Sequence, residues 1–558
     1  MSYYLGIDVG TGSARAAVIN DNGEIKGYAV VPITTHHPMH NIYEQSTQNI
    51  WNSICQAVHD AMATNDLKGQ NIKGIGFDAT CSLVVLDKQG YPQSVDEASE
   101  FTDNTWNVIL WADHRAIEQA KRINDTRHAV LQYVGNTISP EMEIPKTLWL
   151  KENLPEEKWN AIGHLMDLPD FLTFRATGSV ARSTCSLICK CSYLPRGVET
   201  NLPEGWDRDY FEAIGLECLV EEQWKRLGGN EQDEVLHAGD RVGNGLTEQA
   251  ALDLGLLPGT PVGSAVIDAY AGAVATLGAS SSSSSSPLSN RLAIICGTSS
   301  CHIAMARQPI FVPGVWGPYH SVLLPDMWCA EGGQSSTGQL IDYTLNTHPA
   351  IQQAKEKATE KGLNIYTFLN EHLAQLQQQR GLDYLDQLTQ QLHVYPDFHG
   401  NRSPLADPTL RGSLVGVTLD QSVDDLALRY LATLQAIACQ TRHILESMNQ
   451  RGYRIDTLCL SGGLCKNKVF LQLHADVTGC QVVLPESIEA AVVIGAAILG
   501  AKATGNDDLW QTMCRLTRAG DVILPRQDKN IQQLYDRRYR VFGELLKDQK
   551  KYREIMDA

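Results

Sequence analysis

The chain has 558 residues, more than one hydrophobic core usually holds, so we expect two domains. Its composition is that of a globular protein, and a formal charge of -18 argues against nucleic acid or an anionic membrane as a partner. No signal-peptide pattern precedes the first apolar run, and most of the 14 cysteines sit in apolar runs, which indicates reduced thiols in a cytoplasmic protein.

The first predicted strand covers residues 3–7 and leads into a segment that combines Asp8 with two glycines and two hydroxyl residues. Backbone amides in such a turn can cradle phosphate, and a carboxylate beside phosphate calls for a divalent cation between them. A dinucleotide-binding turn would need a third glycine where Arg15 stands, and residues 14–19 are typical of a second strand. The segment predicts a Mg-nucleotide site, although by itself an ordinary glycine-rich turn is the simpler interpretation.

Apolar periodicity predicts a helix over residues 50–63 and a strand over residues 72–77. The tip of that strand, residues 78–82, is either a plain turn or part of a small-molecule site. Asp113 is most simply the N-cap of a helix through residue 123. Lys190 lies in a small, apolar, cysteine-rich segment, where a lysine usually snorkels, though a lysine that faces a sugar hydroxyl gives the same pattern.

In the second half, a predicted strand over residues 261–267 ends at Asp268, which is either a helix N-cap or a functional carboxylate. We place a domain boundary here. The serine tract at residues 280–286 is expected to be a flexible connection between two hairpin strands. Residues 291–300 repeat the first design, an apolar strand followed by Gly-Thr-Ser-Ser. This second copy predicts a duplicated domain with phosphates held between the two hairpins.

Further along, residues 328–334 are expected to begin a helix that runs to residue 345, and residues 423–448 predict a long helix. A strand over residues 457–460 runs into Ser461-Gly462-Gly463, a place where backbone can meet a flat or anionic group of a ligand. The segment after residue 503 is helical and charged.

Two groups of potential metal ligands are not expected to bind a metal ion. Cys185, Cys189 and Cys191 lack a second ligand pair or a nearby histidine to complete a zinc site. The histidines at positions 36, 37 and 40 lie in a proline-containing loop and are expected to be solvated rather than bound to metal. The longest apolar run, residues 490–501, is too short to span a bilayer.

The two Gly-Thr loops, Asp268 and the Ser461-Gly462-Gly463 turn occur in an order that resembles the FGGY carbohydrate kinases, in particular their ribulokinase-type branch. The resemblance runs from about residue 3 to about residue 500. It implies an α/β fold of two actin-like, ribonuclease-H-like domains around a central cleft. The implied boundaries are an N-terminal domain with the sugar site and first phosphate loop at 1–267, a C-terminal domain with the second phosphate loop and adenosine site at 268–503, and a helical tail packed on the latter at 504–558.

The resemblance also implies roles for individual residues. Asp268 would be the general base, and Asp8 would hold Mg²⁺ through water. The residues expected to touch ATP are Gly10, Thr11, Gly12 and Ser13 on one side, Gly297, Thr298 and Ser299 on the other, and Gly462, Gly463 and Asn467 around the adenine and ribose. The sugar pocket is expected to contain Lys190, Glu331, Asp268, the strand tip with Asp78, Ala79, Cys81 and Ser82, and Asp113.

The expected activity is transfer of the γ-phosphate of ATP to a primary hydroxyl of a ketopentose. The favoured acceptor is D-ribulose, which would give D-ribulose 5-phosphate. L-ribulose, D-xylulose or a pentitol are alternative acceptors. A protein of another class, an ATP-driven conformational protein like actin or the Hsp70 chaperones, is disfavoured because it would not need Lys190, Asp268 and Glu331. A homodimer remains open.

Overall fold

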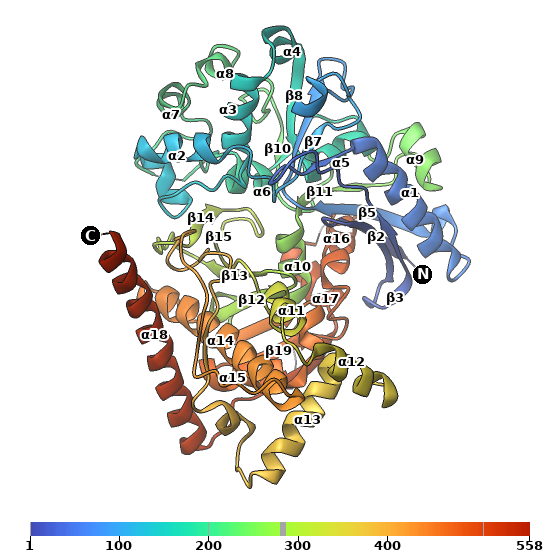
Figure 1. The fold of residues 1–558 in the computed structure, drawn as a ribbon. Coiled ribbons are helices and arrows are strands. Elements are labelled where there is room, and N and C mark those ends of the chain that lie inside the picture. The colour runs from blue at the N-terminus through green and yellow to red at the C-terminus, as the bar shows by residue number, and fades with distance from the viewer. Residues whose placement is uncertain (1, 199, 280–285, 506, 558) are drawn as a thin grey trace.

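The computed structural model describes residues 2–198, 200–279, 286–505 and 507–557, which form two α/β lobes (Figure 1). The N-terminal lobe contains a sheet of order β11-β5-β1-β2-β3, and the C-terminal lobe a sheet of order β14-β15-β13-β12-β18-β19-β20. The strands of the first sheet are β1 (Tyr3–Val9), β2 (Ser13–Asn20), β3 (Ile25–Pro32), β5 (Ile72–Ala79) and β11 (Val262–Ile267). Those of the second are β12 (Arg291–Cys296), β13 (Ser300–Ala306), β14 (Trp316–His320), β15 (Trp328–Gln334), β18 (Thr457–Ser461), β19 (Gln481–Pro485) and β20 (Ala519–Ile523).

The central parts of the two sheets repeat one topology. In the first sheet β1 pairs antiparallel with β2 and parallel with β5; in the second β12 pairs antiparallel with β13 and parallel with β18. The outer strands β11 and β19 continue each sheet in parallel. This repeat confirms the duplication predicted from the two Gly-Thr-Ser loops. The β1–β2 hairpin also excludes a dinucleotide-binding βαβ unit at the N-terminus.

Two helices join the lobes by crossing between them (Figure 1). Helix α10 (Asp268–Leu277) follows β11 of the first sheet, yet it packs against β12 of the second; α16 (Ala491–Lys502) follows β19 and packs on β1 and β5. Glycines let α16 lie directly on the sheet, because a Cβ at Gly6 or Gly76 would lie 2.0 Å from a backbone oxygen of that helix. Each lobe is therefore covered by a helix that the other lobe supplies.

A second, smaller sheet of order β4-β7-β6-β8 extends the N-terminal lobe; its strands are β4 (Glu44–Gln45), β6 (Leu83–Asp87), β7 (Val108–Ile109) and β8 (Ile162–Asp167). The short strands β9 (Arg182–Ser183) and β10 (Val235–Leu236) pair with each other, as do β16 (His393–Tyr395) and β17 (Ser413–Val415). Among the described residues, no helix combines the length and apolar character needed to cross a membrane.

The helices of the N-terminal lobe pack around these sheets; they are α1 (Thr47–Ala63), α2 (Ile117–Asp125), α3 (Glu143–Asn153), α4 (Glu156–Ala161), α5 (Leu168–Thr177), α6 (Thr184–Lys190), α7 (Arg208–Ala213), α8 (Glu217–Glu221) and α9 (Glu248–Leu254). Those of the C-terminal lobe are α11 (Gly338–Asn346), α12 (Ile351–Glu360), α13 (Ile365–Gln379), α14 (Val423–Gln450), α15 (Lys468–Thr478), α17 (Leu509–Leu516) and α18 (Lys529–Asp557). Helices α1 and α14 confirm the two strongest periodic predictions.

Three expectations differ from the structure. Residues 328–334 form β15 rather than the start of a helix, because this run pairs with β13 and β14 and is buried throughout. The C-terminal segment is not only helical, since β20 adds an antiparallel edge strand beside β19. The serine tract follows α10 and precedes β12, so it does not join two hairpin strands, and its residues 280–285 lie outside the described residues.

Candidate active site

The first predicted phosphate loop, residues 10–13, is the turn between β1 and β2. The Gly10 amide donates to the Ser13 carbonyl at 3.0 Å, which leaves Thr11 and Gly12 exposed at the tip. Two side chains hold this tip, one from strand β4 and one from the segment after β7: Gln45 Nε2 donates to the Thr11 carbonyl at 2.8 Å, and Trp111 Nε1 donates to Thr11 Oγ1 at 3.0 Å. A braced, exposed turn of small residues suits close approach to phosphate.

The second predicted loop has the same construction in the other lobe. The Gly297 amide donates to the Ser299 carbonyl at 2.9 Å, so this turn is one residue tighter, and Gly297 and Thr298 are exposed. The start of α11 braces it, since the Thr337 and Gly338 amides donate to the Thr298 and Gly297 carbonyls at 2.9 and 3.1 Å.

Three acidic residues stand where parallel strands of the first sheet end. Asp8 and Asp78 are direct partners in the β1–β5 register, and Asp268 follows the last residue of the neighbouring β11. Because side chains alternate along a strand, Asp8 and Asp78 project from the same face as Gly6 and Gly76, the face on which α16 lies. The three carboxylates therefore meet at the interface between the lobes.

This arrangement changes the acidity of all three groups. Burial and then the charge of Asp8 raise the pKa of Asp268 to about 7. Burial, then Asp8 and Asp268, raise the pKa of Asp78 well above its usual value. The pKa of Asp8 is also raised by burial, although Arg15, at 2.8 Å from its Oδ2, opposes that shift. Buried carboxylates that repel one another favour a bound cation or protons among them.

The residues present fit a divalent ion. Both carboxylate oxygens of Asp78 are buried and have no hydrogen-bond partner in the described part of the chain. Oxygen ligands from one or two carboxylates are the set that Mg²⁺ uses beside substrate phosphates. Asp8 was the predicted metal residue, whereas Asp78 was assigned to the sugar pocket; its position beside Asp8 also makes it a candidate ligand.

The predicted sugar residues Lys190 and Glu331 come from different lobes and meet across the interface. Lys190 Nζ, at the end of α6, lies 3.7 Å from Glu331 Oε2 on β15, and both side chains are about 95% buried. Burial opposes the charge of Lys190, yet Glu331 raises its pKa well above the usual value. Tyr270 donates to the same Glu331 oxygen at 3.1 Å. The snorkelling interpretation of Lys190 is therefore wrong.

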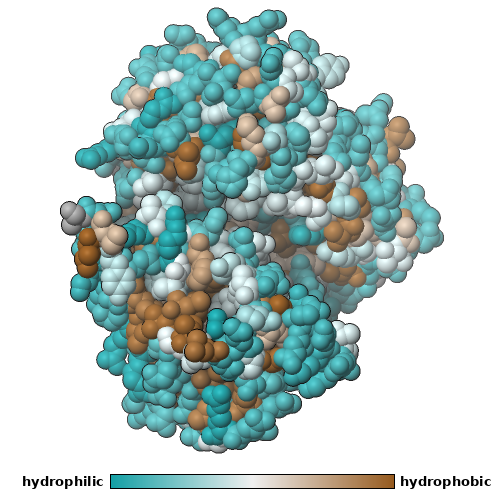
Figure 2. Space-filling view, in the orientation of Figure 1, coloured by the Kyte–Doolittle hydropathy of each residue, from teal (hydrophilic) through white to brown (hydrophobic). Residues whose placement is uncertain are grey.

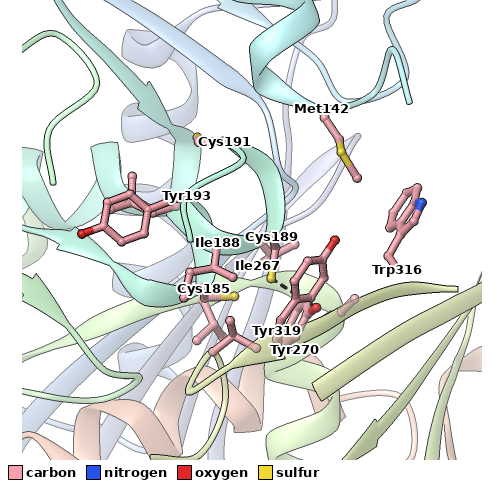
Figure 3. Close-up of a cluster of buried hydrophobic side chains, with 14 of the residues drawn as sticks. Met142, Cys185, Ile188, Cys189, Cys191, Tyr193, Ile267, Tyr270, Trp316 and Tyr319 are labelled. Atoms are coloured by element: carbon pink, nitrogen blue, oxygen red, sulfur yellow. Dashed lines mark hydrogen bonds between the residues drawn. The ribbon is translucent and has the colours of Figure 1, made fainter. Parts of the chain in front are cut away.

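Aromatic and basic side chains surround this pair. The Trp316 ring lies 4.7 Å from Lys190 Nζ and 5.5 Å from the Arg402 guanidinium, and Arg402 in turn pairs with Glu141 at 3.3 Å. Figure 3 shows Tyr270 beside Tyr319 and Cys189, with Trp316 and Met142 set apart from them. In the space-filling view the surface is hollowed between the two lobes (Figure 2).

The residues at the tip of strand β5 differ in how accessible they are to a ligand. Ala79 ends β5 and is buried, and Ser82 is held in the framework because its amide donates to Asp167 Oδ1 at 2.9 Å and its Oγ accepts from the Trp111 amide at 3.2 Å. Cys81 is partly exposed; burial raises the pKa of its thiol well above the usual value, and Lys190 opposes that rise. Of these three residues, Cys81 is the one best placed to meet a ligand.

Asp113 lies in a network of its own. Both of its oxygens accept from Arg115, at 2.9 and 2.8 Å, and Arg115 also pairs with Glu44 at 2.8 Å. Asp113 is not a helix N-cap, since α2 begins at Ile117 with Ala116 before it. With its carboxylate fully engaged, Asp113 supports the segment that carries Trp111 rather than offering a free oxygen to a sugar.

The predicted adenosine residues follow β18. Gly462 has φ +99 and a Cβ there would lie 2.3 Å from the Cys296 carbonyl oxygen, so the backbone requires glycine, whereas Gly463 faces open space. Asn467 caps α15 by accepting from the Val469 and Phe470 amides. Its Nδ2 also donates to Tyr430 Oη at 2.6 Å, so Asn467 fixes the start of the helix beside the glycine pair.

Some candidate residues escaped the sequence analysis. Trp316 lies on an edge strand without a motif, and Arg402 belongs to a run of mostly polar residues, 399–403, in which nothing distinguishes it from its neighbours. Glu143, the first residue of α3, has both carboxylate oxygens buried and unpartnered among the described residues, and burial raises its pKa well above the usual value. No local pattern marked Glu143, because its burial arises from tertiary packing; the charged groups near it are Lys146 of the same helix and then Asp167 and Lys190 from other segments.

Comparison with known proteins decides the family. Residues 3–275 match the N-terminal domain, and residues 292–504 the C-terminal domain, of the FGGY family of carbohydrate kinases. The chain belongs to the FGGY carbohydrate kinases. An FGGY kinase is a sugar phosphotransferase, so the ATP-driven conformational alternative is not retained.

Similar proteins align with this FGGY kinase over most or all of its length. It is 48% identical to an FGGY carbohydrate kinase domain-containing protein of Homo sapiens over 100% of this chain and 98% of that protein. It is 42% identical to a D-ribulokinase of Saccharomyces cerevisiae over 91% of this chain and 72% of that protein. A ligand-bound xylulose kinase from Lactobacillus acidophilus has the same fold, with a TM-score of 0.76 at 18% identity over 99% of this chain and 100% of that one.

Proposed function

We propose that this FGGY kinase transfers the γ-phosphate of ATP to the primary hydroxyl of D-ribulose, giving D-ribulose 5-phosphate and ADP. The observation that carries the proposal is the position of Asp268 at the strand ends where the lobes meet, with a pKa near neutrality. The choice of D-ribulose is supported by the 42% identity to the yeast D-ribulokinase.

In this mechanism Asp268 acts as a general base. Its carboxylate takes the proton of the primary hydroxyl as the sugar oxygen bonds to the γ-phosphorus and the bond from that phosphorus to ADP breaks. A group with a pKa of about 7 is half deprotonated at neutral pH, which suits a base for an alcohol. Mg²⁺ held near Asp8 and Asp78 would neutralise charge on the phosphates.

The amides of the two hairpins bind phosphate from opposite sides, through residues 10–13 and 297–299. Gly462 supplies the backbone conformation of the turn, Gly463 leaves the backbone open beside the adenine, and Asn467 fixes the helix start that follows. Because each lobe supplies one hairpin, ATP can be gripped only when the lobes are together, a common way to exclude water as a competing acceptor.

The sugar is bound by groups that also come from both lobes. Lys190 and Tyr270 meet Glu331, and a sugar hydroxyl can replace the 3.7 Å ion pair with hydrogen bonds to each charge. Cys81 offers a small, nearly apolar wall. We propose that these residues, rather than Asp113, set the acceptor specificity.

The experiment is coupled ADP release with D-ribulose, L-ribulose, D-xylulose and ribitol, each compared with a reaction that lacks sugar. The highest kcat/KM is expected with D-ribulose, and ³¹P NMR should show a phosphate ester on the primary carbon. A higher kcat/KM with another acceptor would replace D-ribulose in the proposal. ADP release at the same rate without sugar would overturn it.

A further inference from the structure

A group of three potential metal ligands lies in the N-terminal lobe, apart from the strand-end carboxylates. His36, Glu44 and Asp96 each offer one donor atom, and these atoms lie within 4.8 Å of one another. Glu44 and Asp96 are buried, and His36 is partly exposed. From sequence, His36 was expected to be solvated; Glu44 lies only eight residues further along, but no pattern connected the two, and Asp96 comes from a segment distant along the chain.

The backbone explains why these residues meet. His36 and Glu44 form an antiparallel bridge in which each amide donates to the other's carbonyl, at 2.8 and 3.0 Å. Residues directly opposite in such a pair carry their side chains on one face. Asp96 is fixed nearby because its Oδ1 accepts from the Ala98 amide at 3.0 Å.

Neighbouring groups orient the donors. The His36 ring stacks on Trp106, with centroids 4.6 Å apart and an interplanar angle of 10°. Arg115 takes only one Glu44 oxygen, Oε1, at 2.8 Å. The other oxygen, Oε2, has no hydrogen-bond partner in the described part of the chain, and bulk water does not reach it because Glu44 is 0% exposed. An unsatisfied buried carboxylate oxygen beside a histidine and a second carboxylate is the unfilled half of a coordination shell.

The local charge supports a cation. Glu44, Asp96 and Asp113 are all buried, and Glu44 and Asp113 share one buried guanidinium, that of Arg115. Burial raises the pKa of Glu44 to about 7; Arg115 opposes this shift, and Asp96 and Asp113 add to it. A dication would compensate the two carboxylates that Arg115 leaves unneutralised.

We propose that His36, Glu44 and Asp96 bind a divalent transition ion of the zinc type. One imidazole and two carboxylates, with water in a fourth position, is a ligand set that suits Zn²⁺ and not Mg²⁺ or Ca²⁺, which prefer oxygen alone. Ligand distances of roughly 2.0–2.2 Å to a shared tetrahedral ion place the donor atoms roughly 3.3–3.6 Å apart, so a pair at the present limit of 4.8 Å would have to close by more than about 1 Å when the ion binds.

The site has a structural connection to the phosphate loop. Gln45, the residue after Glu44, donates to the Thr11 carbonyl at 2.8 Å and to Thr35 Oγ1 at 3.2 Å. A bound ion would tie residues 36, 44 and 96 together and so fix the strand that braces the first hairpin. The site is a structural one, and its occupancy does not depend on the sugar that the enzyme accepts.

The test measures how much zinc the full-length protein retains. Wild-type protein is stripped with chelator, given one equivalent of Zn²⁺ in excess Mg²⁺, desalted and analysed by elemental mass spectrometry. About one zinc per chain should remain, with a rise in Tm. His36→Ala and Asp96→Asn should weaken Zn²⁺ binding roughly 100-fold, more than the loss of an outer-shell partner does. His37→Ala is the matched control, because His37 lies in the same loop but outside the cluster, and it should bind like wild type.

A second measurement keeps all three ligands intact. Co²⁺ in place of Zn²⁺ should quench the emission of Trp106, and Trp106→Phe should lose that component of the quenching. Retention of zinc in His36→Ala and Asp96→Asn at the wild-type level, or no zinc in wild-type protein, would overturn the proposal. Equal quenching by Co²⁺ in wild type and Trp106→Phe would overturn it too.

Discussion

The proposed chemistry depends most directly on one side chain, the carboxylate of Asp268. Asp268→Asn keeps the shape of the side chain and an oxygen that can accept from the Ala269 amide, now at 2.7 Å, but it cannot take a proton. We expect kcat to fall by about 10²–10⁴-fold. ATP affinity, measured by calorimetry, should stay at the wild-type value. Turnover near the wild-type rate would remove Asp268 from the mechanism.

The same residue predicts a pH dependence. Burial, followed by the charge of Asp8, raises the pKa of Asp268 to about 7, so the carboxyl is protonated and inactive as a base below that pH. We therefore expect kcat/KM to rise with pH, with an apparent pKa near 7 for the free enzyme, and to level off above it. The measurement is a rate profile from acid to mildly alkaline pH at fixed ionic strength. A profile that is flat through this range would contradict the assignment.

Asp8 and Asp268 each follow an apolar run, but the residues alone left each with a plain alternative, a glycine-rich turn for Asp8 and a helix N-cap for Asp268. The order of the motifs along the chain, which resembles the FGGY kinases, is what led to the predictions of a metal residue and a general base. Arg402 lies over the Trp316 ring, and the charged groups near Glu143 include Asp167 and Lys190; all of these neighbours belong to other segments of the chain. Their environment arises from tertiary packing, which one sequence does not contain.

At the scale of elements, the contact between α16 and the first sheet depends on glycines. A Cβ at Gly76 would lie 2.0 Å from the Ala496 carbonyl oxygen and 2.7 Å from the Gly500 amide nitrogen. Since backbone atoms cannot turn aside as a side chain does, we expect Gly76→Ala to lower the free energy of unfolding by about 1–3 kcal/mol. Urea unfolding followed by circular dichroism measures this change.

A matched glycine-to-alanine substitution elsewhere should change the free energy of unfolding in the opposite direction. Gly543 lies inside helix α18, and a Cβ added there would meet nothing within 4 Å, so Gly543→Ala should raise the free energy of unfolding by about 0.5–1 kcal/mol. A loss of stability for both variants alike would show that the crowding at Gly76 is not the cause.

The long periodic helix α14 and the apolar strands β1, β5, β11, β12 and β18 were predictable, whereas the strands β15 and β20 were not. The run Trp-Cys-Ala-Glu-Gly-Gly-Gln of β15 contains small residues that fit a strand because β13 and β14 flank it. Strand β20 is short and partly exposed, and its partner β19 is what makes it a strand. In both cases hydrogen bonds to distant strands decide the conformation, and local propensity does not.

At the scale of the molecule, ion pairs cross between the lobes at the proposed sugar site. Lys190 of the N-terminal lobe meets Glu331 of the C-terminal lobe, and Glu141 meets Arg402 in the same way. The Lys190–Glu331 pair is buried and the Glu141–Arg402 pair is partly exposed. Because each lobe supplies one residue of each pair, parting of the lobes would open the proposed sugar site, as in enzymes that close on their substrates.

The crossing of α10 and α16 makes a prediction for the whole chain. Domains bounded at residue 267 would separate the first sheet from α16, whose Ala497 and Ile498 share a buried cluster with Tyr4 and Ile19 of that sheet. A fragment of residues 1–267 should therefore expose apolar surface, bind a hydrophobic dye and unfold without a cooperative transition. Co-expression with residues 268–558 should restore cooperativity, because it returns α16. Cooperative unfolding of the isolated fragment, at the midpoint of the full chain, would show that the N-terminal lobe is stable without its borrowed helix.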